Sequence, residues 1–174
     1  MGAGDARTLA LNVMKNRYKT FSPDTHPWRI ESEYQVNGTI AAGMNDENTL
    51  VVGADGFFLF DNVRKSLVFE ERESNISKSF SAQNSIVTLP NTDKTFHVFG
   101  MRGGIFNFCG NDNWTLNLIP IEYGVTHPVL TRREVEIILN PGFGYNGGFL
   151  AGSFSRDDKK LMLLTCEGLI IYSI

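Results

Sequence analysis

The 174 residues of this sequence are enough for one domain with a buried core, or for two small ones. The 16 basic and 19 acidic side chains leave a net charge of -3, which is too small to indicate a nucleic-acid or membrane partner. No apolar run approaches the roughly 18 residues of a membrane-spanning helix, so we expect no membrane association. The 13 phenylalanines and 17 glycines favour strands joined by tight turns over helices.

Residues 1–39 are expected to form an N-terminal unit with a short helix and one extra strand. Asp5 is placed to cap the helix, and Leu9, Val13 and Met14 would lie on one side of it. These three apolar side chains are candidate partner-binding residues. The extra strand covers residues 28–35, WRIESEYQ.

The cellular location is inferred from the N-terminus and the cysteines. No apolar segment typical of a secretory signal follows Met1. Cys109 and Cys166 lack metal-ligand spacing and are expected to be buried free thiols in a reducing compartment. We therefore expect a cytoplasmic or nuclear protein. A mitochondrial location is the alternative, because residues 1–21 are basic and resemble a transit peptide, although they lack serine.

Three segments of the chain align with one another, which indicates a repeat. Each holds an apolar strand, a polar turn, a second apolar strand, a Gly-bearing turn and a third strand. The segments are residues 40–61, 86–108 and 150–173. Fourth strands follow the first two at residues 66–71 and 115–122. We therefore predict repeat units at 40–72, 86–122 and 150–174, with an insertion at 123–149.

The turns and apolar runs indicate stacked hairpins. Asp55-Gly56 between two apolar runs is a strong hairpin signal, because glycine tolerates positive φ. Residues 57–60, FFLF, and 169–172, LIIY, are apolar on both faces, which is typical of strands covered on both sides. The blades of a β-propeller cover one another in this way.

The third unit carries a specific resemblance. It reads F-S-x-D-x-K-x-L and then G-x-I-I-Y, from Phe154 and Ser155 through to Tyr172. In the first unit, Phe60-Asp61 stands in the place of a Trp-Asp pair. These features resemble the WD-repeat family of β-propellers. The resemblance implies a protein-binding scaffold, and an N-terminal strand that completes the last blade.

The expected fold is thus all-β, a partial or small propeller of about three to four blade-like antiparallel sheets with a short N-terminal helix. A β-sandwich is the alternative, because it also has short strands and Gly turns. Three units do not close a ring. We therefore expect a protein partner or a second copy of the chain to complete the propeller.

The insertion at 123–149 holds the remaining candidate site residues. Residues 131–139 fit either a strand, with Val135 and Ile137 inward, or a short helix capped by Thr131. A Gly-rich loop follows at 140–148 and lacks a phosphate-binding pattern. The candidate partner-binding residues are two arginines before this loop and two aromatic residues within it. They are Arg132, Arg133, Phe143 and Tyr145.

No catalytic or metal-binding motif occurs in the sequence, so we expect no catalytic residues, no metal and no cofactor. The predicted function is a non-catalytic protein–protein interaction scaffold, a propeller-type subunit of a multiprotein assembly. One alternative is a small enzyme or ligand-binding β protein with its site at loop 140–148. Another is a nucleic-acid-binding subunit that uses the basic N-terminal segment, although the acidic balance of the chain argues against it.

Overall fold

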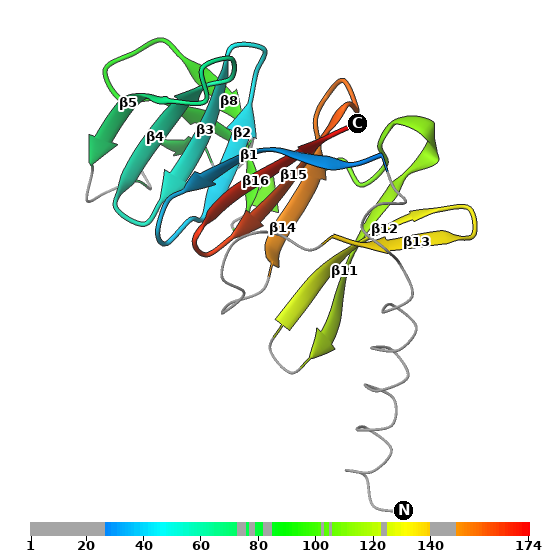
Figure 1. Ribbon diagram of the computed structural model, residues 1–174. Coiled ribbons are helices and arrows are strands. Elements are labelled where there is room, and N and C mark those ends of the chain that lie inside the picture. Colours follow the sequence, from blue (N-terminus) through cyan, green and yellow to red (C-terminus); the bar gives the residue numbers. More distant parts are fainter. Residues whose placement is uncertain are drawn as a thin grey trace, which may run out of the picture.

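The computed structural model describes residues 27–72, 76, 79–81, 85–101, 103–104, 106–122, 125–139 and 149–174. These residues form an arrangement of antiparallel sheets, so the all-β prediction is confirmed (Figure 1). The predicted N-terminal helix, with Leu9, Val13 and Met14, lies outside the described residues.

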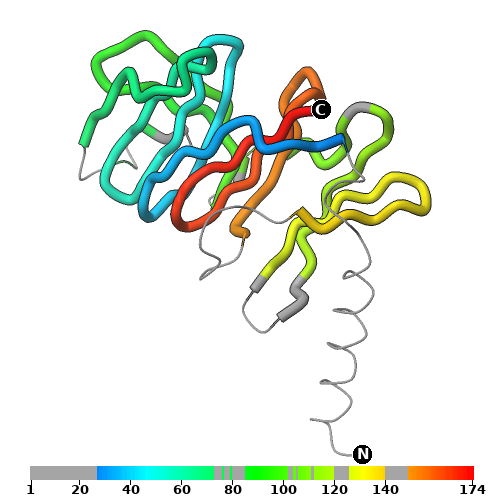
Figure 2. The backbone as a smooth tube through the Cα atoms, viewed as in Figure 1, coloured from blue at the N-terminus to red at the C-terminus, as the bar shows by residue number. Residues whose placement is uncertain are grey.

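Sheet A combines strands from distant parts of the sequence. Its order is β1-β16-β15-β14. The strands are β1 (Arg29–Gln35), β14 (Phe149–Phe154), β15 (Lys160–Thr165) and β16 (Gly168–Ser173). Figure 2 shows the blue segment of β1 running beside the red segment of β16, to which it pairs antiparallel. The strand predicted at residues 28–35 therefore completes the sheet of the last repeat unit.

Sheet B contains the whole of the first repeat unit. Its order is β10-β9-β2-β3-β4-β5. The unit supplies β2 (Ala41–Met44), β3 (Asn48–Gly53), β4 (Gly56–Asp61) and β5 (Leu67–Arg72). Two short strands, β9 (Phe99–Gly100) and β10 (Gly103–Gly104), extend the sheet beside β2.

Sheets A and B share one feature, which lies at the glycine that begins β16 in sheet A and β4 in sheet B. A Cβ atom on Gly56 would lie 2.3 Å from the carbonyl oxygen of Glu71, and one on Gly168 would lie 2.0 Å from that of Tyr34. In both sheets a fourth strand thus approaches the glycine too closely for any side chain. β5 supplies this strand in sheet B, and β1 supplies it in sheet A.

Sheets C and D are smaller. Sheet C has the order β6-β7-β8, with β6 (Phe80–Ser81), β7 (Ile86–Thr88) and β8 (Thr95–His97). Sheet D has the order β11-β12-β13, with β11 (Thr115–Glu122), β12 (Val125–Arg132) and β13 (Val135–Ile138). A short 3-10 segment, Asn111–Asn113, precedes β11. Residues 86–122 therefore contribute strands to three sheets, and residues 125–138 complete sheet D.

Two expectations for these segments need correction. Phe106 to Phe108 form no strand, because their backbone bonds go to other elements: Asn107 O accepts a hydrogen bond from Phe154 N at 2.8 Å. Residues 131–139 belong to the β12–β13 hairpin, so the strand alternative is confirmed and the helix alternative is wrong. Ile137 is buried as predicted, but Val135 is 46% exposed because it pairs with Arg132 beside the turn.

Alternation along β15 shows how sheet A is covered on both faces. Leu161 and Leu163 belong to a buried cluster shared with sheet D, whereas Met162 and Leu164 belong to one shared with sheet B. Complete burial of a leucine side chain contributes roughly 1.5–3 kcal/mol. The apolar run in β15 therefore stabilises the packing of both neighbouring sheets.

Sheet B is covered on its other face by sheet C. Leu50 and Val52 of β3 share a buried cluster with Val87 of β7 and Phe96 of β8. Val51, between them, faces sheet A. The described sheets thus pack face to face in the order D, A, B, C (Figure 1).

Candidate functional site

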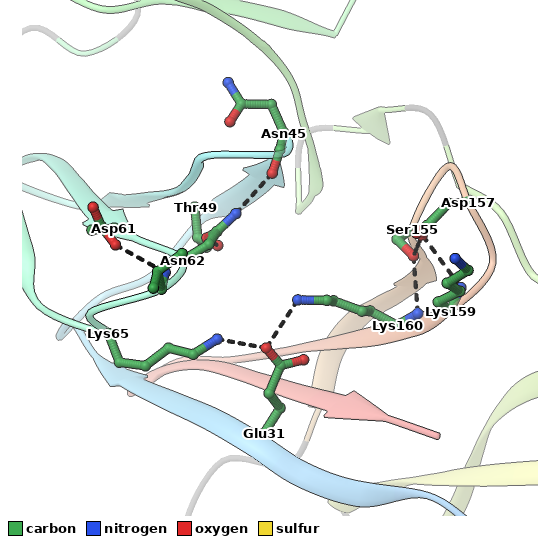
Figure 3. Close-up of polar contacts among 11 residues, drawn as sticks. Glu31, Asn45, Thr49, Asp61, Asn62, Lys65, Ser155, Asp157, Lys159 and Lys160 are labelled. Carbon is green, nitrogen blue, oxygen red and sulfur yellow. Dashed lines mark hydrogen bonds and ion pairs between the residues drawn. The ribbon is translucent and has the colours of Figure 1, made fainter.

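Three polar turns come together at one end of sheets A and B (Figure 3). They are the β2–β3 turn at residues 45–47, the β4–β5 turn at 62–66 and the β14–β15 turn at 155–159. The first and third were predicted as polar turns of the repeat. Their side chains surround the candidate site.

The first two turns are joined by a buried amide. The Asn62 side chain donates through Nδ2 to the carbonyl oxygen of Asn45 at 2.8 Å, and its Oδ1 accepts from Thr49 Oγ1 at 2.6 Å. Asn45 Oδ1 in turn accepts from the backbone N–H of Asn48 at 2.7 Å. Asn62 is 9% exposed and Thr49 is fully buried. The conformation of both turns is therefore fixed by hydrogen bonds within the chain.

Asp61 begins the second turn. Its Oδ1 accepts from the backbone N–H of Arg64 at 2.7 Å and of Val63 at 2.9 Å. The bond from Arg64 is the strongest influence on the carboxyl and lowers the pKa of Asp61. This carboxylate serves the turn and is not a free acid for chemistry.

Ser155 and Asp157 fix the third turn. Ser155 Oγ donates to Asp157 Oδ1 at 2.6 Å and accepts from the backbone N–H of Lys160 at 3.0 Å. The hydrogen bond from Ser155 is the main reason that the pKa of Asp157 is lowered. Because the Ser155 hydroxyl both donates and accepts a hydrogen bond within the turn, Ser155 acts here as a turn residue rather than as a nucleophile.

Glu31 of β1 lies beside these turns and joins two sheets. Its Oε1 accepts from Lys65 Nζ at 2.5 Å and from Lys160 Nζ at 2.9 Å (Figure 3). Burial alone would raise the pKa of Glu31, but the two lysine hydrogen bonds and charges outweigh it and lower the pKa. Glu31 thus connects β1 to the β4–β5 turn of sheet B and to β15 of sheet A.

A hollow of about 520 Å³ opens between the ends of sheets A, B and C. Large apolar side chains form its floor: Met44, Phe96, Phe99, Phe154 and Met162. Polar residues form its rim: Asn45, Thr95, His97, Asn107, Ser153, Ser155 and Arg156. Among the described residues that line it, Arg156 is the only one with a permanent charge.

A second hollow, of about 450 Å³, adjoins the first. Four residues line both hollows: Met44, Asn45, Ser155 and Arg156. The second hollow is more polar, with Asp46, Asn62, Asp157 and Lys160 in its lining. We call the two hollows together the turn-end groove. Its shape and lining suit the binding of an extended segment with an apolar side chain.

The predicted arginines lie elsewhere, at the β12–β13 turn. The guanidinium of Arg132 lies 5.6 Å from the centre of the Trp114 ring, and its Nη2 is 3.7 Å from Asp112 Oδ2. Arg133 is exposed in the turn, with φ 54°. Both line a separate hollow of about 530 Å³ that shares no lining residue with the turn-end groove.

The remaining predicted site residues fall outside the described part of the chain. These are Leu9, Val13, Met14, Phe143 and Tyr145, together with the Gly-rich loop 140–148. Conversely, sequence reasoning missed Met44, His97, Asn107 and Arg156. The polar turns were recognisable, but only the packing of sheets A, B and C brings these four side chains to one place.

Within the described residues, no group of three or more His, Cys, Asp and Glu side chains could hold a metal ion, and no helix is long and apolar enough to cross a membrane. The expectation of buried thiols is wrong for Cys109, which is exposed and forms an isolated bridge with Thr115 of β11, while Cys166 is half-buried. No protein-family model and no curated protein sequence matches this chain. Its function is therefore inferred from its sheets and its groove.

Proposed function

We propose that the protein is a non-catalytic interaction subunit that holds a segment of a partner protein in the turn-end groove. The observation that carries this proposal is the groove itself, an apolar floor with a polar rim where three sheets end. Its larger hollow, at about 520 Å³, is within the range of roughly 300–1,000 Å³ common for binding pockets.

The groove is suited to binding because its walls are already ordered. Asn62 and Ser155 fix the turns that carry the rim, so little conformational freedom remains to be lost when a partner binds. Met44, which is half-buried in the lining, has a flexible thioether side chain that adapts to varied apolar partners. Both properties favour recognition of a protein segment.

We further propose that the described sheets are blades of a partial propeller. The face-to-face stacking of four sheets supports the proposal, and a β-sandwich is the alternative. The completion of sheet A by β1 is also a feature of propellers whose N-terminal strand closes the last blade. In this proposal, a partner or a second copy of the chain contacts sheets C and D, which end the described stack.

The binding proposal is tested by comparing two charge reversals in the same turn. Arg156 lines the groove, whereas Lys159 is exposed and lines neither hollow. Proteins that copurify with the tagged chain from cells are quantified for the wild type, R156E and K159E. We expect a defined set to fall by about tenfold with R156E, a change of 1.4 kcal/mol in binding, and to persist with K159E. Equal recovery with all three chains contradicts the proposal.

The propeller proposal is tested by the mass of the purified chain in solution, measured by light scattering. A stable dimer supports completion by a second copy. A monomer that recovers a stoichiometric partner from cells supports completion by another protein. A stable, compact monomer without such a partner contradicts the need for completion.

A further inference from the structure

We propose that the turn-end groove recognises an internal acidic–apolar motif, in which a large apolar side chain stands next to an aspartate or glutamate. This inference rests on the proposed function and adds the chemistry of the partner segment. It follows from the apolar side chains and the arginine that line the larger hollow, and from the absence of a carboxylate among its described lining residues.

The floor of the hollow provides the site for the apolar side chain. Phe96, Phe99 and Phe154 are each 2% exposed and Met162 is 6% exposed, so they are held in place by the packing of the sheets. They come from β8, β9, β14 and β15. A ligand side chain of the size of phenylalanine, leucine or methionine that enters the hollow therefore lies against apolar residues from three sheets.

Arg156 is the only permanently charged residue among the described lining residues of the larger hollow, and none of them is a carboxylate. The second hollow holds charges of both signs, with Asp46, Asp157 and Lys160 in its lining. The two acids that follow Arg156 in the turn are already engaged. Asp157 accepts from Ser155, and Asp158 Oδ1 accepts from Asn107 Nδ2 at 2.6 Å. Within the larger hollow, a carboxylate on the ligand therefore meets the arginine without a competing acid, whereas Asp46 lines the second hollow together with Arg156.

The position of Arg156 sets the spacing of the motif. Arg156 lines both hollows and so lies at the boundary between them. An acidic side chain close in sequence to the residue anchored on the apolar floor can therefore reach it. We place the carboxylate of the motif in the immediate neighbourhood of the anchor.

The second hollow indicates that the carboxylate belongs to a side chain. The groove continues beyond Arg156 past Asn62 and Lys160, where a ligand chain has room to extend. A C-terminal carboxylate at Arg156 would leave this part of the groove empty. We therefore assign the motif to the interior of the partner chain.

The test is a selection from a random peptide library displayed on phage, run in parallel on the purified full-length wild type, R156E and K159E. We expect the wild type and K159E to enrich peptides with Phe, Leu or Met beside Asp or Glu. We expect R156E to lose this enrichment or to replace the acid by Lys or Arg. No enrichment with the wild type, or enrichment of apolar peptides without an acid, overturns the inference.

The best peptide is then synthesised with a free and with an amidated C-terminus, and its Kd is measured by fluorescence anisotropy. We expect equal affinity for both forms, about tenfold weaker binding to R156E and unchanged binding to K159E. Thr95→Trp, a substitution at an exposed residue on the rim, should also block binding of the peptide. A Kd that depends on the free C-terminus, or that R156E leaves unchanged, overturns the inference.

Failure of this inference is distinguishable from failure of the proposed function. If R156E loses its cellular partners while the selection yields no acidic–apolar peptides, the groove binds a partner of other chemistry. If R156E retains all partners, the groove is not the interaction site, and both proposals fail together.

Discussion

Lys160 Nζ donates a hydrogen bond to Glu31 Oε1 at 2.9 Å, although the two residues are 129 positions apart in the sequence. Lys65 donates to the same oxygen atom from the β4–β5 turn. The single carboxylate thus links β1 to β15 within sheet A and to the β4–β5 turn of sheet B (Figure 3). Its contribution to stability can be measured directly.

Replacing Glu31 with glutamine should lower the free energy of unfolding by about 0.5–1 kcal/mol, because partly exposed ion pairs contribute little more than this. The side chain of Glu31 is 23% exposed, so solvent screens part of the interaction. Urea denaturation followed by fluorescence measures the change. E33Q is the matched control, since Glu33 is exposed on the same strand and should tolerate the change. Equal effects of E31Q and E33Q would argue against the two ion pairs.

The advantage of the wild type over E31Q should depend on pH. Because the folded state lowers the pKa of Glu31 below its ordinary value of 4.5, the unfolded chain takes up a proton first as the pH falls. The stabilisation is thus complete well above pH 4.5 and is lost as the pH falls through the lowered folded pKa. Urea midpoints of both chains between neutral and strongly acidic pH would show this, and a constant difference over the whole range would contradict it.

Asn62→Ala should destabilise the protein by about 2 kcal/mol, because it leaves the buried Thr49 hydroxyl and the Asn45 carbonyl without their partner. Thr49→Val should cost about 1 kcal/mol for the same reason. Since the two side chains bond to each other, the double variant should cost less than the sum, by about 1 kcal/mol. Denaturation of the four chains in a double-mutant cycle measures this coupling, and strict additivity would refute the bond.

Gly168→Ala should destabilise sheet A by about 2 kcal/mol or more. The added methyl group would lie 2.0 Å from the Tyr34 carbonyl oxygen, and φ of Gly168 is 154°, a backbone conformation unfavourable for alanine. Thermal denaturation gives the change in Tm. The control is E167A in the same turn, where no such contact with β1 arises. A Tm for G168A close to that of E167A would mean that β1 does not approach the glycine so closely.

The hairpins of the first and third units could be predicted because their signals are local. Hairpins are found at Asp55-Gly56 and at Glu167-Gly168, although Ala54-Asp55 and Cys166-Glu167 occupy the turns and each glycine begins the following strand. The role of β1 was also predictable, since residues 28–35 form a strand without a partner in its own neighbourhood. These features depend on turn chemistry and on the alternation of side chains.

The groove and the second unit could not be predicted, because they depend on contacts between distant segments. Residues 106–108 are apolar enough to suggest a strand, yet Asn107 bonds to the edge of β14 instead. In the sequence, Arg156 is one of several polar residues in the turn at 155–159, and nothing local indicates a binding role for it. Only the packing of sheets A, B and C brings it together with Phe96 of sheet C and Phe99 of sheet B.

The pairing of β1 with β16 also has a consequence for how this protein is made. A ribosome releases residues 29–35 long before it adds residues 168–173, so β1 emerges without the strand that it pairs with. Until late in synthesis Trp28, which is 1% exposed in the finished fold, also lacks Phe154, against which its ring packs. Such delayed long-range pairing slows folding and exposes nascent chains to aggregation. We therefore expect chaperones to hold the nascent chain until the β15–β16 hairpin is synthesised.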